Sequence, residues 1–137
     1  MNAMVQRLHG LPQGLQFALV GGAAAATHLL AVALWVHWAG MAPLVANGLG
    51  FLVAFVVSYN GHAWLTFSCS GARGWSVAGR YFAVASLSFA VNELLYAAAL
   101  HWLGWNYLVS LLLVLLLVAV GTFVLSKTWA FKRPGKA

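Results

Sequence analysis

Glu93 is the only acidic residue among 137, and it lies in the middle of an apolar stretch. His28 has a similar place in an earlier apolar stretch, and Thr27 and Asn92 stand beside the two. A charged side chain deep in a bilayer costs roughly 2.5–3.5 kcal/mol on insertion scales, so such residues usually pair or line a polar path. We therefore expect these four side chains to line a substrate or proton path. The alternative is that they are polar contacts between helices, worth about 1 kcal/mol each.

A second polar group stands where the apolar stretches end. It consists of Arg80, Lys127, His62, Asn60, Arg73 and Lys132. Arg80 and Lys127 are at stretch edges, where charge-assisted hydrogen bonds can hold a lipid phosphate. The alternative is that these cations only set the orientation of a membrane protein.

Residue types that other chemistries require are missing. The chain has one cysteine, which excludes an internal disulfide and a cysteine-based metal site. It has no carboxylate pair, no Asp-x-Asp motif and no glycine-rich phosphate loop followed by lysine. The sequence therefore predicts a protein that is not an enzyme and that uses no metal and no cofactor.

The composition requires a bilayer as the solvent. Hydrophobic residues make up 64% of the chain and charged residues 6%, with a mean hydropathy of +0.90. A soluble domain of this size would leave much of that apolar surface in water. The net charge of +6 is also compatible with nucleic-acid binding. However, the basic residues flank apolar stretches, so we expect anionic lipids as partners and no nucleic acid.

Four stretches are long enough to cross the hydrocarbon core as helices, at about 20 residues each. They cover about 15–38, 44–67, 81–103 and 107–131. The links at 39–43 and 104–106 are short, so the predicted fold is an all-α membrane protein with two repeated antiparallel hairpins. Residues 1–14 are predicted to form an interfacial segment, 15–131 the transmembrane domain, and 132–137 a basic cytoplasmic tail.

The positive charges predict the orientation. All seven Lys and Arg residues fall on one side of this topology, and the two short links on the other side carry none. The positive-inside rule then places both termini in the cytoplasm. We expect the protein to be integral to the cytoplasmic (inner) membrane. Aromatic residues predict the two interfaces: Trp35, Trp38, Trp102, Trp105 and Tyr107 outside, and Trp64, Phe67, Trp75, Tyr81, Trp129 and Phe131 inside.

The two hairpins look like one sequence written twice. At a shift of 65 residues, Thr27-His28 falls on Asn92-Glu93, and at a shift of 64, 62–67 falls on 126–131. Parallel repeats of this kind are related by an axis along the membrane normal. Span two also carries small residues four apart, Ala46, Gly50, Ala54 and Ser58. This pattern predicts close helix packing, with Gly22 and Ala26 as the partner face.

Four short motifs resemble the GtrA-like family, over roughly 14–133. They are Phe17-Ala-Leu-Val-Gly21, Tyr59-Asn-Gly-His-Ala-Trp-Leu-Thr-Phe67, Arg80-Tyr-Phe-Ala-Val84 and Ser126-Lys-Thr-Trp-Ala-Phe131. The family pattern at the even-span ends is similar to Asn-x-x-Trp-x-Phe. Here Phe67, Trp129 and Phe131 fit this pattern as motif aromatics, whereas His62 and Ser126 stand at the Asn place.

The resemblance implies work in cell-surface polysaccharide synthesis. Its members are thought to flip polyprenyl-phosphate-linked monosaccharides across the membrane for a glycosyltransferase on the far side. The expected partners are this sugar lipid and membrane glycosyltransferases, and we expect a homo-oligomer because four helices make a thin wall. Two alternatives stay open: a non-transporting accessory subunit of a membrane glycosyltransferase, and a small proton-coupled drug transporter.

Overall fold

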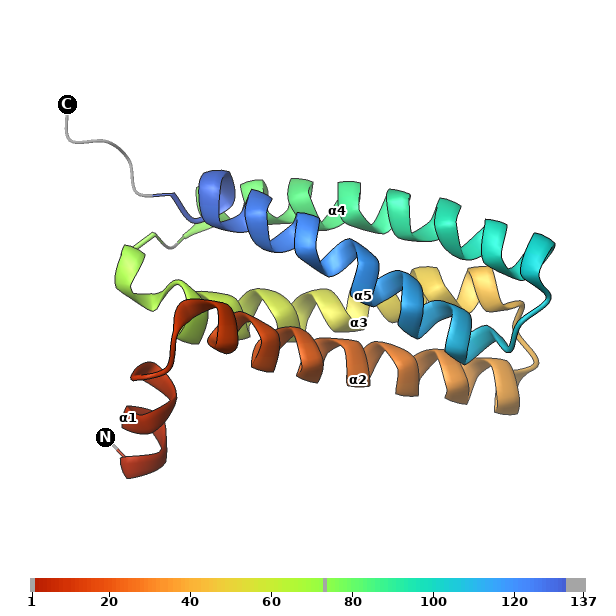
Figure 1. Ribbon diagram of the computed structural model, residues 1–137, viewed down its shortest axis with the longest axis horizontal. Helices are drawn as coiled ribbons and strands as arrows, with labels where there is room; N and C mark the ends of the chain where they lie inside the picture. The colour runs from red at the N-terminus through yellow and green to blue at the C-terminus, as the bar shows by residue number, and fades with distance from the viewer. Residues whose placement is uncertain (1, 73, 133–137) are drawn as a thin grey trace.

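The computed structural model describes residues 2–72 and 74–132. In this part of the chain, four long helices run side by side (Figure 1): α2 (Gln13–Ala39), α3 (Pro43–Gly61), α4 (Trp75–Ala98) and α5 (Tyr107–Leu125). Single π-helical turns extend three of them: η1 (His62–Thr66), η3 (Ala99–Leu103) and η4 (Ser126–Ala130). The short helices are α1 (Ala3–His9) and the 3₁₀ turn η2 (Ser68–Ser70). The chain is an all-α membrane protein with four spans, as the sequence predicts.

The four continuous helices are long and apolar enough to cross a membrane. They cover Gln13–Ala39, Pro43–Thr66, Trp75–Leu103 and Tyr107–Ala130. The third helix begins at Trp75 rather than at the predicted residue 81. The helix begins earlier because Val77 is buried in a cluster with Tyr81 and Phe131, so this first turn also packs against the bundle. Arg80 Nε donates to the Ala130 carbonyl at 3.2 Å.

One tight turn connects the two helices of each hairpin. Gly40 and Gly104 end α2 and η3 in the left-handed region, with φ of 64° and 60°, which side chains with a Cβ rarely adopt. Pro43 then starts α3, and the Asn106 side chain accepts hydrogen bonds from two backbone N–H groups of α5. We call this the turn end, and we call the end with α1, η1, η2 and η4 the terminal end (Figure 1).

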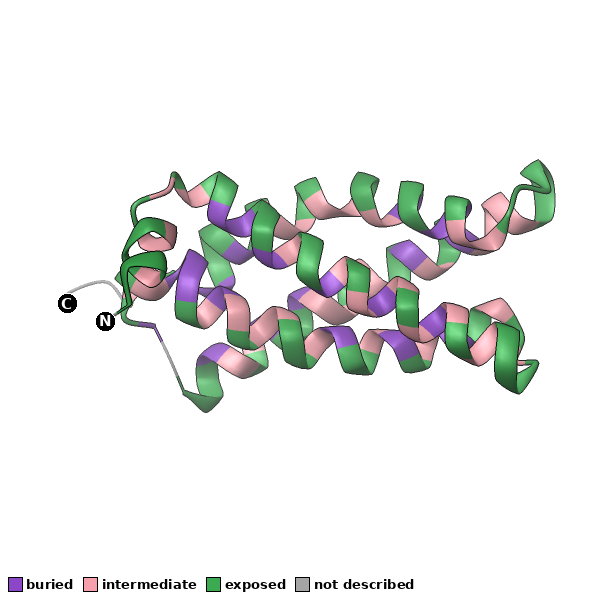
Figure 2. Ribbon diagram, turned by 90° about the horizontal axis from the view of Figure 1, so that it is seen from below, coloured by how far each residue is buried: buried purple, intermediate pink, exposed green. Residues whose placement is uncertain are grey.

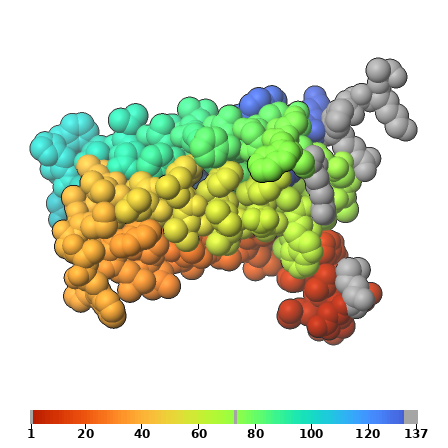
Figure 3. All heavy atoms as spheres, turned by 180° about the vertical axis from the view of Figure 1, so that it is seen from behind, coloured from red at the N-terminus to blue at the C-terminus, as the bar shows by residue number. Residues whose placement is uncertain are grey.

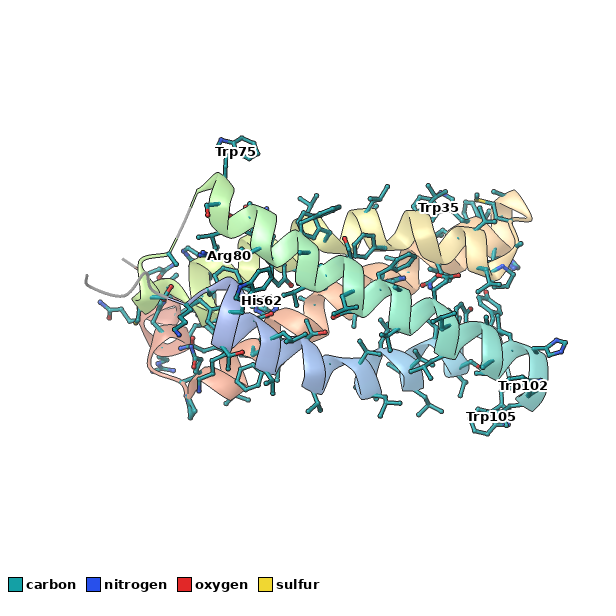
Figure 4. The ribbon with its side chains drawn as sticks, turned by 90° about the horizontal axis from the view of Figure 1, so that it is seen from above. Trp35, His62, Trp75, Arg80, Trp102 and Trp105 are labelled. Atoms are coloured by element: carbon teal, nitrogen blue, oxygen red, sulfur yellow. The ribbon has the colours of Figure 1, made fainter. Side chains whose placement is uncertain are left out.

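Burial follows the requirements of a lipid-facing bundle. Many large apolar side chains are exposed on the outside of the bundle. Buried residues recur at intervals along each long helix, between intermediate and exposed ones (Figure 2). Exposed tryptophans stand at both ends, with Trp75 at the terminal end and Trp102 and Trp105 at the turn end (Figure 4). Phe67, Tyr81 and Phe131, which the sequence assigns to the inner interface, lie at the terminal end and are buried within the protein. They pack together in a terminal-end core.

The two hairpins repeat at a single offset of 64 residues. Gly40 and Gly104 share their φ angle, and η1 and η4 are both π-helical at that offset. Buried positions in the odd spans follow it too: Phe17 and Tyr81, Val20 and Val84, His28 and Asn92, Val32 and Tyr96. The predicted shift of 65 for the odd spans is therefore wrong by one residue. The structural counterpart of His28 is Asn92, not Glu93.

The first hairpin is held by close helix contacts at glycine. A Cβ added at Gly50 would lie 2.8 Å from His28 Cδ2, and one at Gly61 would lie 2.6 Å from Val20 Cγ1. The small-residue pattern thus correctly predicts close packing. Its predicted partner face is wrong, since Gly22 and Ala26 are exposed and the helix presents His28 and Val32 instead.

Candidate functional site: a polar network beside a lateral groove

A buried asparagine joins three helices deep inside the bundle. Asn47 on α3 accepts a hydrogen bond from His28 Nε2 on α2 at 2.7 Å. Its Nδ2 donates to Asn92 Oδ1 at 3.1 Å and to Glu93 Oε2 at 2.6 Å, both on α4. Because the Asn47 oxygen can only accept, His28 carries its proton on Nε2. Asn47 therefore bridges His28 and Glu93, which make no direct pair.

The network has one side chain with an unused donor. Asn92 is 3% exposed, and its Nδ2 has no hydrogen-bond partner in the part of the chain that the structure describes. A buried polar atom without a partner costs free energy unless a ligand or water satisfies it. Asn92 therefore offers an N–H group for a ligand at this place.

A lateral groove of about 490 Å³ lies between the four helices. Its α2 side carries small residues at helical spacing, Gly14, Ala18, Gly21, Gly22 and Ala25, which face leucines and valines of α5. These small residues leave room between α2 and α5, the two helices nearest the viewer in Figure 1. On the opposite side, in Figure 3, the side chains of α3 and α4 meet along the face.

Polar groups stand at three levels along this mainly apolar groove. Near the terminal end Ser58 and Tyr81 share a hydrogen bond between α3 and α4. Farther along, Ser88 and Thr122 join α4 and α5 at 2.8 Å, and each lines the groove. His28 and Asn92 form the deepest level. A hydroxyl-bearing ligand would meet a hydrogen-bonding group at each level.

The four residues predicted to form a path do not all lie together. His28 and Asn92 line the groove, whereas Glu93 does not and reaches the network only through Asn47. Thr27 also lies apart, since its hydroxyl donates to the Ala23 carbonyl of its own helix at 2.9 Å. The structure thus brings together three of the four, two of them in the groove wall.

The predicted phosphate-binding group is dispersed. Lys127 is exposed, and its Nζ lies 5.8 Å from the ring centroid of Phe123, a groove residue. Arg80 donates to the Ala130 carbonyl, and Asn60 donates to the Val56 carbonyl of its own helix at 2.8 Å. Among the described cations of this group, Lys127 thus lies close to a groove residue at the terminal end of the groove, which we call the groove mouth.

The remaining members of that group have different surroundings. His62 lines the groove near the terminal end, but it is buried, stacks on Phe17 with centroids 4.4 Å apart, and contacts Thr66 Oγ1 at 2.9 Å (Figure 4). Lys132 is exposed at the terminal end. Arg73 lies outside the described residues.

The motif aromatics divide into two kinds. Phe67 and Phe131, the counterparts that follow η1 and η4, are buried and stack on each other with centroids 4.4 Å apart. Trp129 is half exposed on the outer surface. The two phenylalanines thus join the hairpins at the terminal end, where the repeat axis must pass.

Sequence reasoning missed Asn47, the centre of the network. The available signal was an asparagine near the start of an apolar span, a residue type that such a position rarely keeps without a partner. The groove hydroxyls Ser88 and Thr122 give a weaker signal, because single hydroxyls are frequent in membrane helices.

Comparison with known proteins identifies a membrane domain. The family model described as GtrA/DPMS, transmembrane domain, matches residues 16–131. No curated protein and no solved structure shows significant similarity to the chain. Among the described residues, no group of three or more His, Cys, Asp and Glu side chains is placed to hold a metal ion.

Proposed function

The chain belongs to the GtrA/DPMS transmembrane-domain family, and from this premise we propose that it flips polyprenyl-phosphate-linked monosaccharides between leaflets. The family links the chain to membrane processes that handle polyprenyl-phosphate sugars, and its members are typically non-catalytic. In our proposal the sugar lipid serves cell-surface polysaccharide synthesis, and a membrane glycosyltransferase uses it after transfer.

The lateral groove is the observation that carries this proposal. A phosphosugar cannot cross hydrocarbon unaided, but its polyprenyl chain can stay in lipid while the headgroup moves through a polar path. The groove between α2 and α5 is deep enough to reach His28 and Asn92, and it carries hydroxyl groups on the way. The apolar lining around these groups suits the first isoprene units of the chain.

Lys127 is the proposed first contact for the phosphate. It is exposed beside the groove mouth, whereas Arg80 already has a backbone partner in the Ala130 carbonyl. An ammonium group there attracts the phosphate through charge-assisted hydrogen bonds. This placement fits the orientation that we propose, in which the protein lies in the inner membrane and its terminal end faces the cytoplasm.

The test is transbilayer movement in proteoliposomes. Polyprenyl-phosphate sugar is placed in one leaflet, and its accessibility from the other is followed for wild type, Asn92→Leu and a control, Asn60→Leu. Asn60 is exposed and bonded to its own helix, so its variant should retain transport. We expect Asn92→Leu to lose about tenfold or more in rate, because the headgroup loses a buried partner.

Two other outcomes favour the alternatives. If folded wild-type protein moves no lipid and co-purifies with a glycosyltransferase, the chain is an accessory subunit. If Glu93→Gln abolishes proton-coupled cation efflux while sugar lipid stays in place, the chain is a drug transporter. The position of Glu93 outside the groove lining favours neither a proton nor a cation path through the groove.

A further inference from the structure

The groove stops at the same level on all four helices. On α2 and α4, which run toward the turn end, the last lining residues are His28 and Asn92. On α3 and α5, which run back from the turn end, the first lining residues are Phe51 and Leu112. No residue nearer the turn end of any helix contributes to it. Beyond this level a more open, apolar depression continues between α2 and α5 alone, and it is lined by Leu29, Leu30, Ala33, Leu108, Val109 and Leu112. The part of the groove that all four helices line therefore ends at one level.

A single layer of packed side chains closes this part of the groove toward the turn end. Val32, Ala46, Tyr96 and Leu111, one from each helix, have exposed fractions of 0% and belong to one cluster. We call these four residues the turn-end layer. Val32 and Tyr96 are counterparts in the two hairpins, so the layer crosses the repeat axis.

Two hydroxyl groups without partners lie in the turn-end layer or directly beside it. The Tyr96 hydroxyl and the hydroxyl of Ser110, the neighbour of Leu111, are fully buried with no hydrogen-bond partner in the described part of the chain. Phenylalanine and alanine would fill the same space without the cost of two unsatisfied hydroxyls. A layer that served only as permanent packing would gain from being apolar.

We propose that the turn-end layer is the far-side gate of the groove, and that Tyr96 and Ser110 bind sugar hydroxyls when it opens. The gate continues the sequence of polar levels from Asn92, which lies one helical turn before Tyr96 on the same face of α4. The structure then represents the state that is closed at the turn end. The ligand, a hydroxyl-rich headgroup, rests on the proposed function, but the opening of the layer does not.

Cysteine accessibility tests the gate without any substrate. The chain's one cysteine, Cys69, is replaced by serine, and Ser110→Cys is exposed to a membrane-impermeant maleimide on the turn side. Val84→Cys, equally buried but in the terminal-end core, is the matched control, and it is exposed to the same maleimide on the side of the terminal end. We expect Ser110→Cys to react at least about tenfold faster than the control, because an opening gate exposes it and core breathing does not.

Equal reaction rates would overturn the gate and make the layer permanent packing. If Ser110→Cys fails to fold, Ala46→Cys tests the same layer, since Ala46 is a small buried member of it. Faster labelling on the side of the terminal end than on the turn side would also contradict the proposal.

Tyr96→Phe tests the binding role separately. The variant keeps the packing and removes one hydroxyl, so we expect sugar-lipid movement to slow about five- to tenfold while binding from the terminal-end leaflet is unchanged. Movement at the wild-type rate would overturn the binding role. If Ser110→Cys is labelled on the turn side but the wild-type protein moves no sugar lipid, the proposed function and the binding role both fail, while the gate stands.

Discussion

The hairpin of α2 and α3 and the hairpin of α4 and α5 repeat one another but are packed differently. In the first, Gly50 and Gly61 allow close contact, and the two helices pack along most of their length. In the second, Gly79 and Gly121 have nothing within 4 Å of an added Cβ, and the helices pack less extensively. A hydrogen bond between Ser88 and Thr122 crosses the second pair instead.

Unsatisfied polar groups divide in the same way. Among the described residues, the buried side-chain atoms without a partner belong to Asn92, Tyr96, Ser110 and Ser126, all in the second hairpin. In the first hairpin the corresponding polar side chains, such as His28 and His62, have partners. We infer that the first hairpin is the rigid scaffold and that the second can move against it.

The largest effect should come from forcing the tight hairpin apart. In Gly50→Leu the new Cβ alone would lie 2.8 Å from the His28 ring and 3.0 Å from Val32, so the helices must separate. Overpacking of this kind costs about 1–3 kcal/mol and sometimes more, and we expect the upper end. Thermal unfolding in detergent measures the loss of stability.

Gly121→Leu is the matched control, because this helical position of α5 is open. Its stability should stay the same or rise, since leucine favours helix over glycine by about 0.8–1 kcal/mol. Equal losses for the two variants would contradict the difference in packing between the hairpins.

The next effect should come from cutting the connection between the hairpins. Asn47→Leu leaves His28, Asn92 and Glu93 without the partner they share. Each buried group left unsatisfied costs about 1–3 kcal/mol of stability. This cost is smaller where the freed groups form hydrogen bonds with each other or with water in the membrane. We expect a net loss of about 2 kcal/mol in denaturant unfolding. An Asn47→Leu protein as stable as wild type would show that the network does not join the hairpins.

Counterpart positions at the terminal end should respond unequally. His62→Ala removes a ring stacked on Phe17 and a contact to Thr66, so it should lower stability by about 1–2 kcal/mol. Ser126→Ala removes a buried hydroxyl that has no partner, so it should change stability by less than about 0.5 kcal/mol. A larger loss at Ser126 than at His62 would reverse the comparison.

The sequence predicts the architecture well because composition and length decide it. Apolar stretches of about 20 residues can only become spans, and Gly40 and Gly104 fit the short turns that make hairpins. The family is predicted from motifs at the span ends, and the match over 16–131 confirms it.

The arrangement of the candidate site is harder to predict because it depends on which face of a helix a residue occupies. One residue along an α-helix turns the side chain by about 100°, so the alignment of His28 with Glu93 does not reveal that Asn92 lines the groove while Glu93 reaches the network through Asn47. The amino-acid types of the odd spans match best at a shift of 65 residues. Their buried positions instead follow the offset of 64 residues that relates Gly40 to Gly104. The hydrogen bonds of Arg80 and Asn60 to backbone carbonyls could not be predicted for another reason, since these partners exist only in the fold.

The smallest expected effect concerns the side-chain hydrogen bond between Ser88 on α4 and Thr122 on α5. A double-mutant cycle with Ser88→Ala and Thr122→Val should give a coupling energy of about 0.6 kcal/mol, the mean for such bonds in a membrane bundle. The bond is weak because Thr122 Oγ1 also donates to the Val118 carbonyl of its own helix at 3.1 Å, so it keeps a partner when Ser88 is lost. A coupling energy of 2 kcal/mol or more, about three times this mean, would show that the second hairpin is fastened as firmly as the first. A coupling near the mean would leave α5 free to shift along α4 by the exchange of one hydroxyl partner for another, which is the freedom that opening the turn-end layer requires.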